Sequence, residues 1–167
     1  MELLDIYDNN GNPTGRKIIR GDKTEVLNEN EHIAVAVIFI ENSNNQFLIQ
    51  KTSALKGGEY SSTGGHIDSG ETPIKAIKRE VEEELGVNVD NDNIIYYGFL
   101  LYDMPIRYLF YLRKDININD LKLQTEEVDY VKFMSIDEIN KLIKDNKMLK
   151  SHGIMFQELL KRRNNNE

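Results

Sequence analysis

One helical segment with well-marked ends constrains this chain more than any other feature. Thr72 followed by Pro73 is a helix start, because threonine caps free backbone N–H groups and proline is tolerated at the first helical position. Gly86 is a suitable stop, since glycine readily adopts the left-handed conformation that ends helices. The sequence therefore predicts a helix over residues 73–85.

The stretch REVEEELG in the second half of this helix carries an unusual distribution of charge. At about 100° per residue, Glu80, Glu83 and Glu84 share an arc of about 100° beside the apolar stripe, whereas Glu82 points away. Arg79 is the nearby cation and can pair with Glu83, four residues later. Two interpretations remain at this point: an acidic surface, or a site for a hard divalent cation such as Mg²⁺, which prefers clustered carboxylate oxygens.

The remaining patterns predict a mixed α+β fold rather than a regular βαβ array. A continuous apolar, β-branched run over 32–40 indicates a buried strand. Further strands are expected around a turn within 3–19, and over 46–51, 60–63, 93–103, 105–113 and 129–134, and further helices over 135–146 and 151–162. We expect one domain over residues 1–167, an α/β/α sandwich with an N-terminal β-hairpin extension (1–30) and a frayed tail (162–167).

Composition narrows the classes of partner. The net charge of −7 disfavours binding to a nucleic-acid polymer, and it requires that cations mediate contact with a polyanionic small molecule. No apolar run approaches the ~20 residues of a membrane helix. The chain has no cysteine and an acidic N-terminus without a secretion signal, which fits the cytoplasm.

The wider stretch GHIDSGETPIKAIKREVEEELGV, residues 65–87, resembles the Nudix box, the signature of the Nudix (MutT-like) hydrolases. Five residues separate Gly65 from Glu71, and seven residues separate Glu71 from the run REVEEELGV. All seven fixed positions and both apolar positions of the signature match. The order of the surrounding elements also resembles the α/β/α sandwich of that family.

The resemblance implies a metal site and a set of ligands. Nudix hydrolases cleave diphosphates, typically a nucleoside diphosphate linked to another group, with Mg²⁺ or Mn²⁺. The matching positions make Glu80, Glu83 and Glu84 the metal ligands, with the carbonyl of Gly65 as a further ligand. By the same resemblance, Glu71 braces the loop of the box against its helix.

The resemblance also implies catalytic roles. Arg79, Glu80 and Glu83 form the expected catalytic group, in which Arg79 orients the glutamates. Activation of a water needs a proton acceptor within reach, and Glu80 is one candidate. Many relatives use a glutamate from a later loop as base or metal ligand; Glu126 and Glu127 are the matching candidates here, and we name Glu127 as the expected ligand.

The predicted function is therefore metal-dependent hydrolysis of a small diphosphate by an activated water. Two alternatives remain open. The N-terminal segment is similar to a Nudix branch related to isopentenyl diphosphate isomerase, although the cysteine acid of that enzyme is missing here. The other alternative is a nucleotide-sensing module that binds without cleavage.

Substrate choice and assembly are the least defined features of the sequence. We expect loops around the box, at 53–62 and 101–106, to select the substrate. The edge of the N-terminal hairpin could pair two copies into a homodimer.

Overall fold

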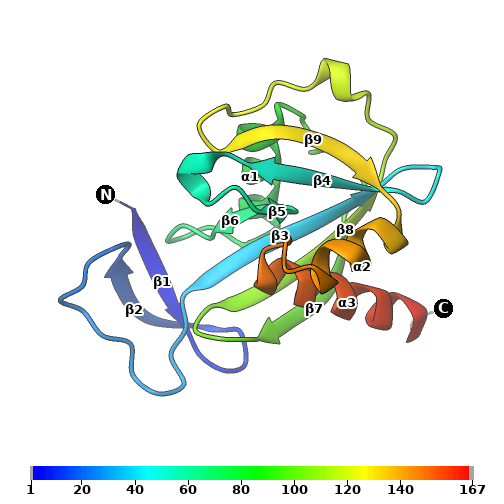
Figure 1. The fold of residues 1–167 in the computed structure, drawn as a ribbon. Coiled ribbons are helices and arrows are strands. Elements are labelled where there is room, and N and C mark those ends of the chain that lie inside the picture. Colours follow the sequence, from blue (N-terminus) through cyan, green and yellow to red (C-terminus); the bar gives the residue numbers. More distant parts are fainter. Residues whose placement is uncertain (1, 166–167) are drawn as a thin grey trace.

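The computed structural model of the protein describes residues 2–165. Its strands and helices follow the predicted order (Figure 1). The strands are β1 (Leu3–Tyr7), β2 (Pro13–Ile19), β3 (Ala34–Glu41), β4 (Phe47–Thr52), β5 (Tyr60–Ser61), β6 (Thr63–His66), β7 (Ile95–Leu101), β8 (Ile106–Arg113) and β9 (Val128–Met134). The helices are α1 (Pro73–Leu85), α2 (Ile136–Lys144) and α3 (Lys150–Asn165), with short 3-10 turns η1 (Ala54–Lys56) and η2 (Ile118–Asp120).

Strand β3 lies at the centre of the sheet, and all eight of its residues are buried. It pairs in parallel with β8 and antiparallel with β6. Ala36 and Ile38 on one face belong to the core cluster that α1 covers, whereas Phe39 on the other face packs against Phe156 of α3. Figure 1 shows α2 and α3 in front of the sheet and α1 behind it. Helices on both faces explain the unbroken apolar run of β3 and confirm the predicted α/β/α sandwich.

The sheet opens next to this central strand. β3 and β4 pair at one position, Glu41 with Phe47, and β4 then continues against β5 and β9 while β3 continues against β6. Strands β4 and β6 therefore diverge, and the space between them is available for a binding site.

The N-terminal segment forms the predicted antiparallel pair, β1 with β2. Leu4, Ile6 and Ile18 make a small apolar cluster of its own, which partly buried Leu27 and Ile33 extend. This hairpin projects from one edge of the molecule in Figure 1.

The C-terminal helix continues beyond its expected end. Residues 162–165, which we expected to fray, belong to α3, whereas 166 and 167 lie outside the described residues. The guanidinium of Arg162 donates hydrogen bonds to the carbonyls of Tyr97 (2.8 Å) and Phe99 (3.1 Å), which attaches the last turns of α3 to β7. A long-range contact of this kind has no signature in local sequence.

Within residues 2–165, none of the helices has the length and apolar character that crossing a bilayer requires.

Replacing Arg162 with glutamine should lower the free energy of unfolding by about 1–2 kcal/mol, because its two hydrogen bonds to β7 and its ion pair with Glu158 are lost. Urea denaturation measures the change, and amide exchange in the last turns of α3 should accelerate. The neighbouring, exposed Lys161 serves as the matched control: Lys161→Gln should change stability by less than about 0.5 kcal/mol. Equal effects of the two substitutions would contradict the attachment.

Candidate active site

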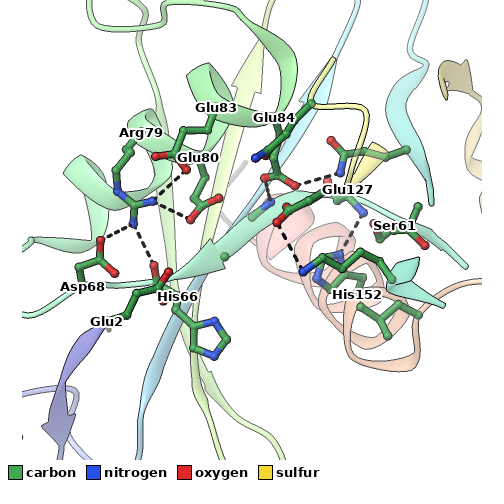
Figure 2. A pocket seen from close by; sticks show the side chains of 18 of the residues that line it. Glu2, Ser61, His66, Asp68, Arg79, Glu80, Glu83, Glu84, Glu127 and His152 are labelled. Carbon is green, nitrogen blue, oxygen red and sulfur yellow. Dashed lines mark hydrogen bonds and ion pairs between the residues drawn. The ribbon is translucent and has the colours of Figure 1, made fainter. Parts of the chain in front are cut away.

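A polar cavity of about 520 Å³ opens beside α1, where β4 and β6 diverge (Figure 2). Its wall consists of α1, β4 to β6, η1, the loop before β9, the start of α3 and the N-terminal hairpin. The residues predicted as metal ligands all line it, together with the predicted orienting arginine: Gly65, Glu80, Glu83, Glu84, Glu127 and Arg79.

Helix α1 turns its acidic side into this cavity because its ends and its apolar stripe are both constrained. The Thr72 hydroxyl accepts a hydrogen bond from the backbone three residues later, and Gly86 ends the helix with a φ of 70°. Ile77, Val81 and Leu85 are fully buried in the core. The helix therefore cannot rotate about its axis without exposing this stripe. Its bounds, Pro73–Leu85, are those predicted from the sequence.

Arg79 forms hydrogen bonds with several acidic side chains of the site. Its guanidinium donates two hydrogen bonds to Glu71, both at 2.8 Å, and others to Glu80 (2.8 Å), Glu83 (3.3 Å) and the carbonyl of His66 (3.0 Å). The bond with Glu71 lowers the pKa of that carboxyl and raises the pKa of Arg79 further above its usual value. The pair with Glu83, expected from spacing, is present, but Glu71 provides the stronger, two-pronged contact.

Glu84 is a buried carboxyl, with 5% of its surface exposed. It accepts hydrogen bonds from the Gln50 amide (3.2 Å) and the backbone N–H of Gly64 (3.1 Å). The hydroxyl of Thr63 donates to the Gln50 oxygen (2.9 Å), which orients the amide so that its NH₂ group faces Glu84. Burial, with the charge of Glu80 adding to it, raises the pKa of Glu84 to about 9. Ionisation of Glu84 is therefore disfavoured unless positive charge comes close to its carboxyl.

Glu80 lies against the start of the box loop. A Cβ atom on Gly65 would stand 2.4 Å from a carboxylate oxygen of Glu80, so only glycine permits this close approach. Burial raises the pKa of Glu80, and the charge of Glu83 adds to this effect, whereas Arg79 opposes it. At Glu80, the positive charge of Arg79 therefore does not fully offset the cost of burying the carboxylate.

The structure separates the two candidate glutamates of the later loop. The backbone N–H of Ser53 donates to the carbonyl of Glu127 (2.9 Å), and its hydroxyl donates to the carbonyl of Glu126 (2.6 Å). With the loop attached in this way, the Glu127 side chain lines the cavity, whereas Glu126 is exposed outside it. The Glu127 charge adds to burial in raising the pKa values of Glu80 and Glu84, so the three carboxyls act on one another.

The donor set suits a hard divalent cation, although the side chains do not yet surround one. Across residues 2–165, no three carboxylate or imidazole side chains already converge on a cation position. Glu80 is turned toward Arg79, and Glu84 toward Gln50. The available donors are nevertheless oxygen atoms in a polar cavity, with glycine at the point of closest approach, which is what Mg²⁺ or Mn²⁺ prefers.

The cavity also contains residues that the sequence did not single out. They come from four different segments: Glu2, Arg20, Gln50, Gln124 and His152. None belongs to a motif with recognisable spacing, and only the pairing of β4 with β9 and the packing of α3 and the hairpin bring them together. No local signal in the sequence could have found them.

Of the two loops expected to select the substrate, one lines the cavity and the other does not. Segment 53–62 contributes to the cavity wall, but no residue of 101–106 does. The latter turn contacts the segment before β3 instead, where the carbonyl of Met104 is hydrogen-bonded to the His32 ring at 2.9 Å.

Comparisons with known proteins show which family this chain resembles. The model of the family described as "NUDIX domain" matches residues 30–157. An uncharacterized Nudix hydrolase of Listeria innocua is 33% identical over 147 residues, which is 85% of each chain. An 8-oxo-dGTP diphosphatase of Haemophilus influenzae is 36% identical over 87 residues, 48% of this chain and 61% of the relative.

Solved structures share the fold. A crystal structure from Deinococcus radiodurans superposes with a TM-score of 0.77 at 20% identity, covering 93% of this chain and 98% of the other. A MutT structure from a study of Aliivibrio salmonicida and Vibrio cholerae gives a TM-score of 0.55 at 21% identity, covering 66% and 85%.

The pH dependence of His152 tests how the start of α3 packs against the cavity wall. Its Nδ1 accepts a hydrogen bond from the backbone N–H of Ser62 (3.0 Å), and burial, with the charge of Arg107, lowers its pKa to about 4. The unfolded chain takes up this proton near pH 6.5, so the contribution of His152 to stability is complete above that pH and is lost as the pH falls through 4. The loss amounts to at most about 3 kcal/mol.

An NMR titration of the His152 ring should therefore give a midpoint near pH 4. The variant His152→Gln should show a smaller loss of stability between pH 6.5 and 4 than the parent protein. A ring that titrates near pH 6.5 would contradict the buried, hydrogen-bonded placement.

Proposed function

This chain belongs to the Nudix family and is a pyrophosphohydrolase, and from its site we propose that it requires Mg²⁺ or Mn²⁺ and cleaves a small diphosphate, such as a nucleoside diphosphate derivative. The observation that carries the proposal is that Glu80, Glu83 and Glu84 of α1 line the same cavity as Gly65 and as Glu127 of the loop before β9. Clustered acids would repel a substrate that is itself an anion, unless cations lie between them. A bound divalent cation would neutralise the diphosphate and lower the pKa of a water.

The residues of the chain restrain these acids before any cation binds. Arg79 restrains Glu80 and Glu83 from the box side, and Gln50 restrains Glu84 from β4. Positioning of this kind is the main contribution of a protein to phosphoryl transfer, where charge stabilisation dominates.

Glu80 and Glu127 are the two candidates for accepting the proton of the attacking water. Glu80 is the more buried and sits next to Arg79, whereas Glu127 faces it from the loop before β9 and is paired with Lys56 at 3.5 Å. Glu127→Gln and Glu80→Gln discriminate between them. Substitution of the base should remove the rising acidic limb of the pH–rate profile, and substitution of a ligand alone should leave that limb in place.

A test of the whole assignment compares four glutamates of one helix. With Mg²⁺, the variants Glu80→Gln, Glu83→Gln and Glu84→Gln should each lose at least about 100-fold in kcat on any diphosphate that the parent cleaves. Glu82→Gln should stay within about twofold, because Glu82 is exposed and lies outside the cavity. Equal losses at all four positions would overturn the site.

The assay panel should hold nucleoside triphosphates, dinucleotides, nucleotide sugars and isopentenyl diphosphate. Release of phosphate or nucleotide supports the hydrolase. Double-bond migration would indicate the isomerase alternative, and tight binding without turnover would indicate a sensor.

Metal removal gives a readout that needs no substrate. Mg²⁺ at 100 times its Kd should stabilise the parent protein by about 2.7 kcal/mol, since ligand binding to the folded state adds RT ln(1 + [L]/Kd). Chelation with EDTA should reverse this gain and abolish turnover. The gain should shrink in Glu83→Gln and persist in Glu82→Gln, as followed by thermal melting. Identical gains in the two variants would contradict the metal assignment.

A further inference from the structure

The imidazole of His152 is held in the cavity wall by one definite hydrogen bond. Its Nδ1 accepts from the backbone N–H of Ser62 at 3.0 Å, and Ser62 is buried. The start of α3, which carries His152, is attached to β5, because the N–H of Tyr60 donates to the carbonyl of Lys147 (3.0 Å) and the N–H of Leu149 donates to the carbonyl of Tyr60 (2.8 Å). Turning the ring would leave a buried N–H without a partner, which is costly.

This hydrogen bond determines which nitrogen of the His152 ring carries the proton. A backbone N–H can only donate, so Nδ1 is the unprotonated acceptor, and a neutral imidazole then carries its proton on Nε2. Burial, with the charge of Arg107 adding to it, lowers the pKa of the ring and so favours this neutral form. The ring therefore presents Nε2–H as a donor.

The Nε2–H of His152 is open to the cavity. Among the described residues, 2–165, the one hydrogen bond of the ring is that of Nδ1, and every buried side-chain nitrogen or oxygen has a partner. An Nε2 without a partner is therefore accessible, and the ring lines the cavity. Figure 2 shows His152 and Arg79 on opposite sides of this cavity. A ligand that fills the cavity would meet this donor from α3.

The chain around β6 brings this donor close to the carboxylates of α1. The N–H groups of Ser62 and Gly64 are two residues apart, and one donates to His152 whereas the other donates to the Glu84 carboxylate (3.1 Å). Two residues of extended chain span about 7 Å. A donor on α3 and a candidate metal ligand on α1 are thus attached to neighbouring points of one segment, at a separation that a diphosphate bound to a cation at Glu84 can bridge.

The charge around His152 favours an anion. Burial is the main cause of the lowered pKa values of His66 and His152, and the positive charge of Arg107 adds to it at both rings. Arg107 and His66 pair with Val35 from its two sides, in β8 and β6. Positive charge therefore acts on the part of the cavity wall that carries the two imidazoles, whereas the carboxylates come from α1.

We propose that His152 is a substrate-binding residue whose Nε2–H donates a hydrogen bond to a phosphate oxygen of the diphosphate. The inference rests on the proposed diphosphate hydrolysis and adds a residue to it. A neutral donor has an advantage in a cavity with several acids, because it forms no ion pair with them. The cation Lys56, in contrast, is paired with Glu127 at 3.5 Å.

Two substitutions separate the two edges of the ring. In His152→Asn, the amide oxygen can take the place of Nδ1 and accept from Ser62, but no atom replaces Nε2–H. In His152→Gln, the longer amide can place its NH₂ group near the position of Nε2, but Ser62 loses its acceptor. With Mg²⁺ and a diphosphate that the parent cleaves, His152→Asn should raise KM about tenfold, the effect of one lost hydrogen bond, with kcat within about threefold and Tm near that of the parent. His152→Gln should lower Tm and raise KM less.

Gln157→Asn is the control on the same helix, because Gln157 is exposed and does not line the cavity. It should leave both KM and Tm unchanged. Nitrogen-15 NMR of the His152 ring adds a readout without turnover. The proton should reside on Nε2, and methylenediphosphonate with Mg²⁺ should shift the Nε2–H resonance further than Mg²⁺ alone does.

Three results would overturn the inference while leaving the hydrolase in place. The first is a ring proton on Nδ1, and the second is an Nε2–H resonance that methylenediphosphonate does not move. The third is a KM that rises more in His152→Gln than in His152→Asn, which is the order expected if the ring only supports the fold. Failure to cleave any diphosphate with Mg²⁺ would overturn both proposals.

Discussion

The contact between Arg79 and the acids around it is the interaction on which the site depends. One guanidinium binds Glu71 in the loop, Glu80 and Glu83 on the helix, and the carbonyl of His66 on the strand that precedes them. It therefore joins strand, loop and helix into one unit while partly neutralising acids that would otherwise repel one another. A lysine could not replace it, because a single ammonium lacks the planar, multi-donor geometry.

Even with the Arg79 guanidinium nearby, the acidic face of α1 carries more negative than positive charge. Glu80, Glu83 and Glu84 occupy the end of α1, where the helix dipole already disfavours negative charge, and the last turn holds no basic residue. Burial, with the charge of Glu80 adding to it, raises the pKa of the Glu84 carboxyl. A bound divalent cation would supply the missing positive charge. Cation binding would then stabilise the folded protein through the same residues that would take part in the chemistry.

The cavity exists because strands β4 and β6 diverge within the sheet. Because β3 and β4 separate after a single paired position, β4 carries Gln50 to one side of α1 while β6 carries Gly65 to the other. The loop before β9 and the N-terminal hairpin then close the remaining sides. The family-matched segment supplies the acids of the wall, and the N-terminal hairpin, which precedes residue 30, contributes Arg20.

Local sequence was sufficient for every feature that depends on neighbours a few residues apart. The cap at Thr72, the stop at Gly86 and the 100° periodicity determined the helix and the direction of its acids, and the apolar run of β3 indicated a strand buried on both faces. Tertiary structure alone decided that Glu127 rather than Glu126 enters the cavity, and which residues of β4, α3 and the hairpin join it there. The physical reason is that these placements depend on hydrogen bonds and packing between segments far apart in the chain, such as Ser53 with the loop before β9, and periodicity carries no information about such contacts.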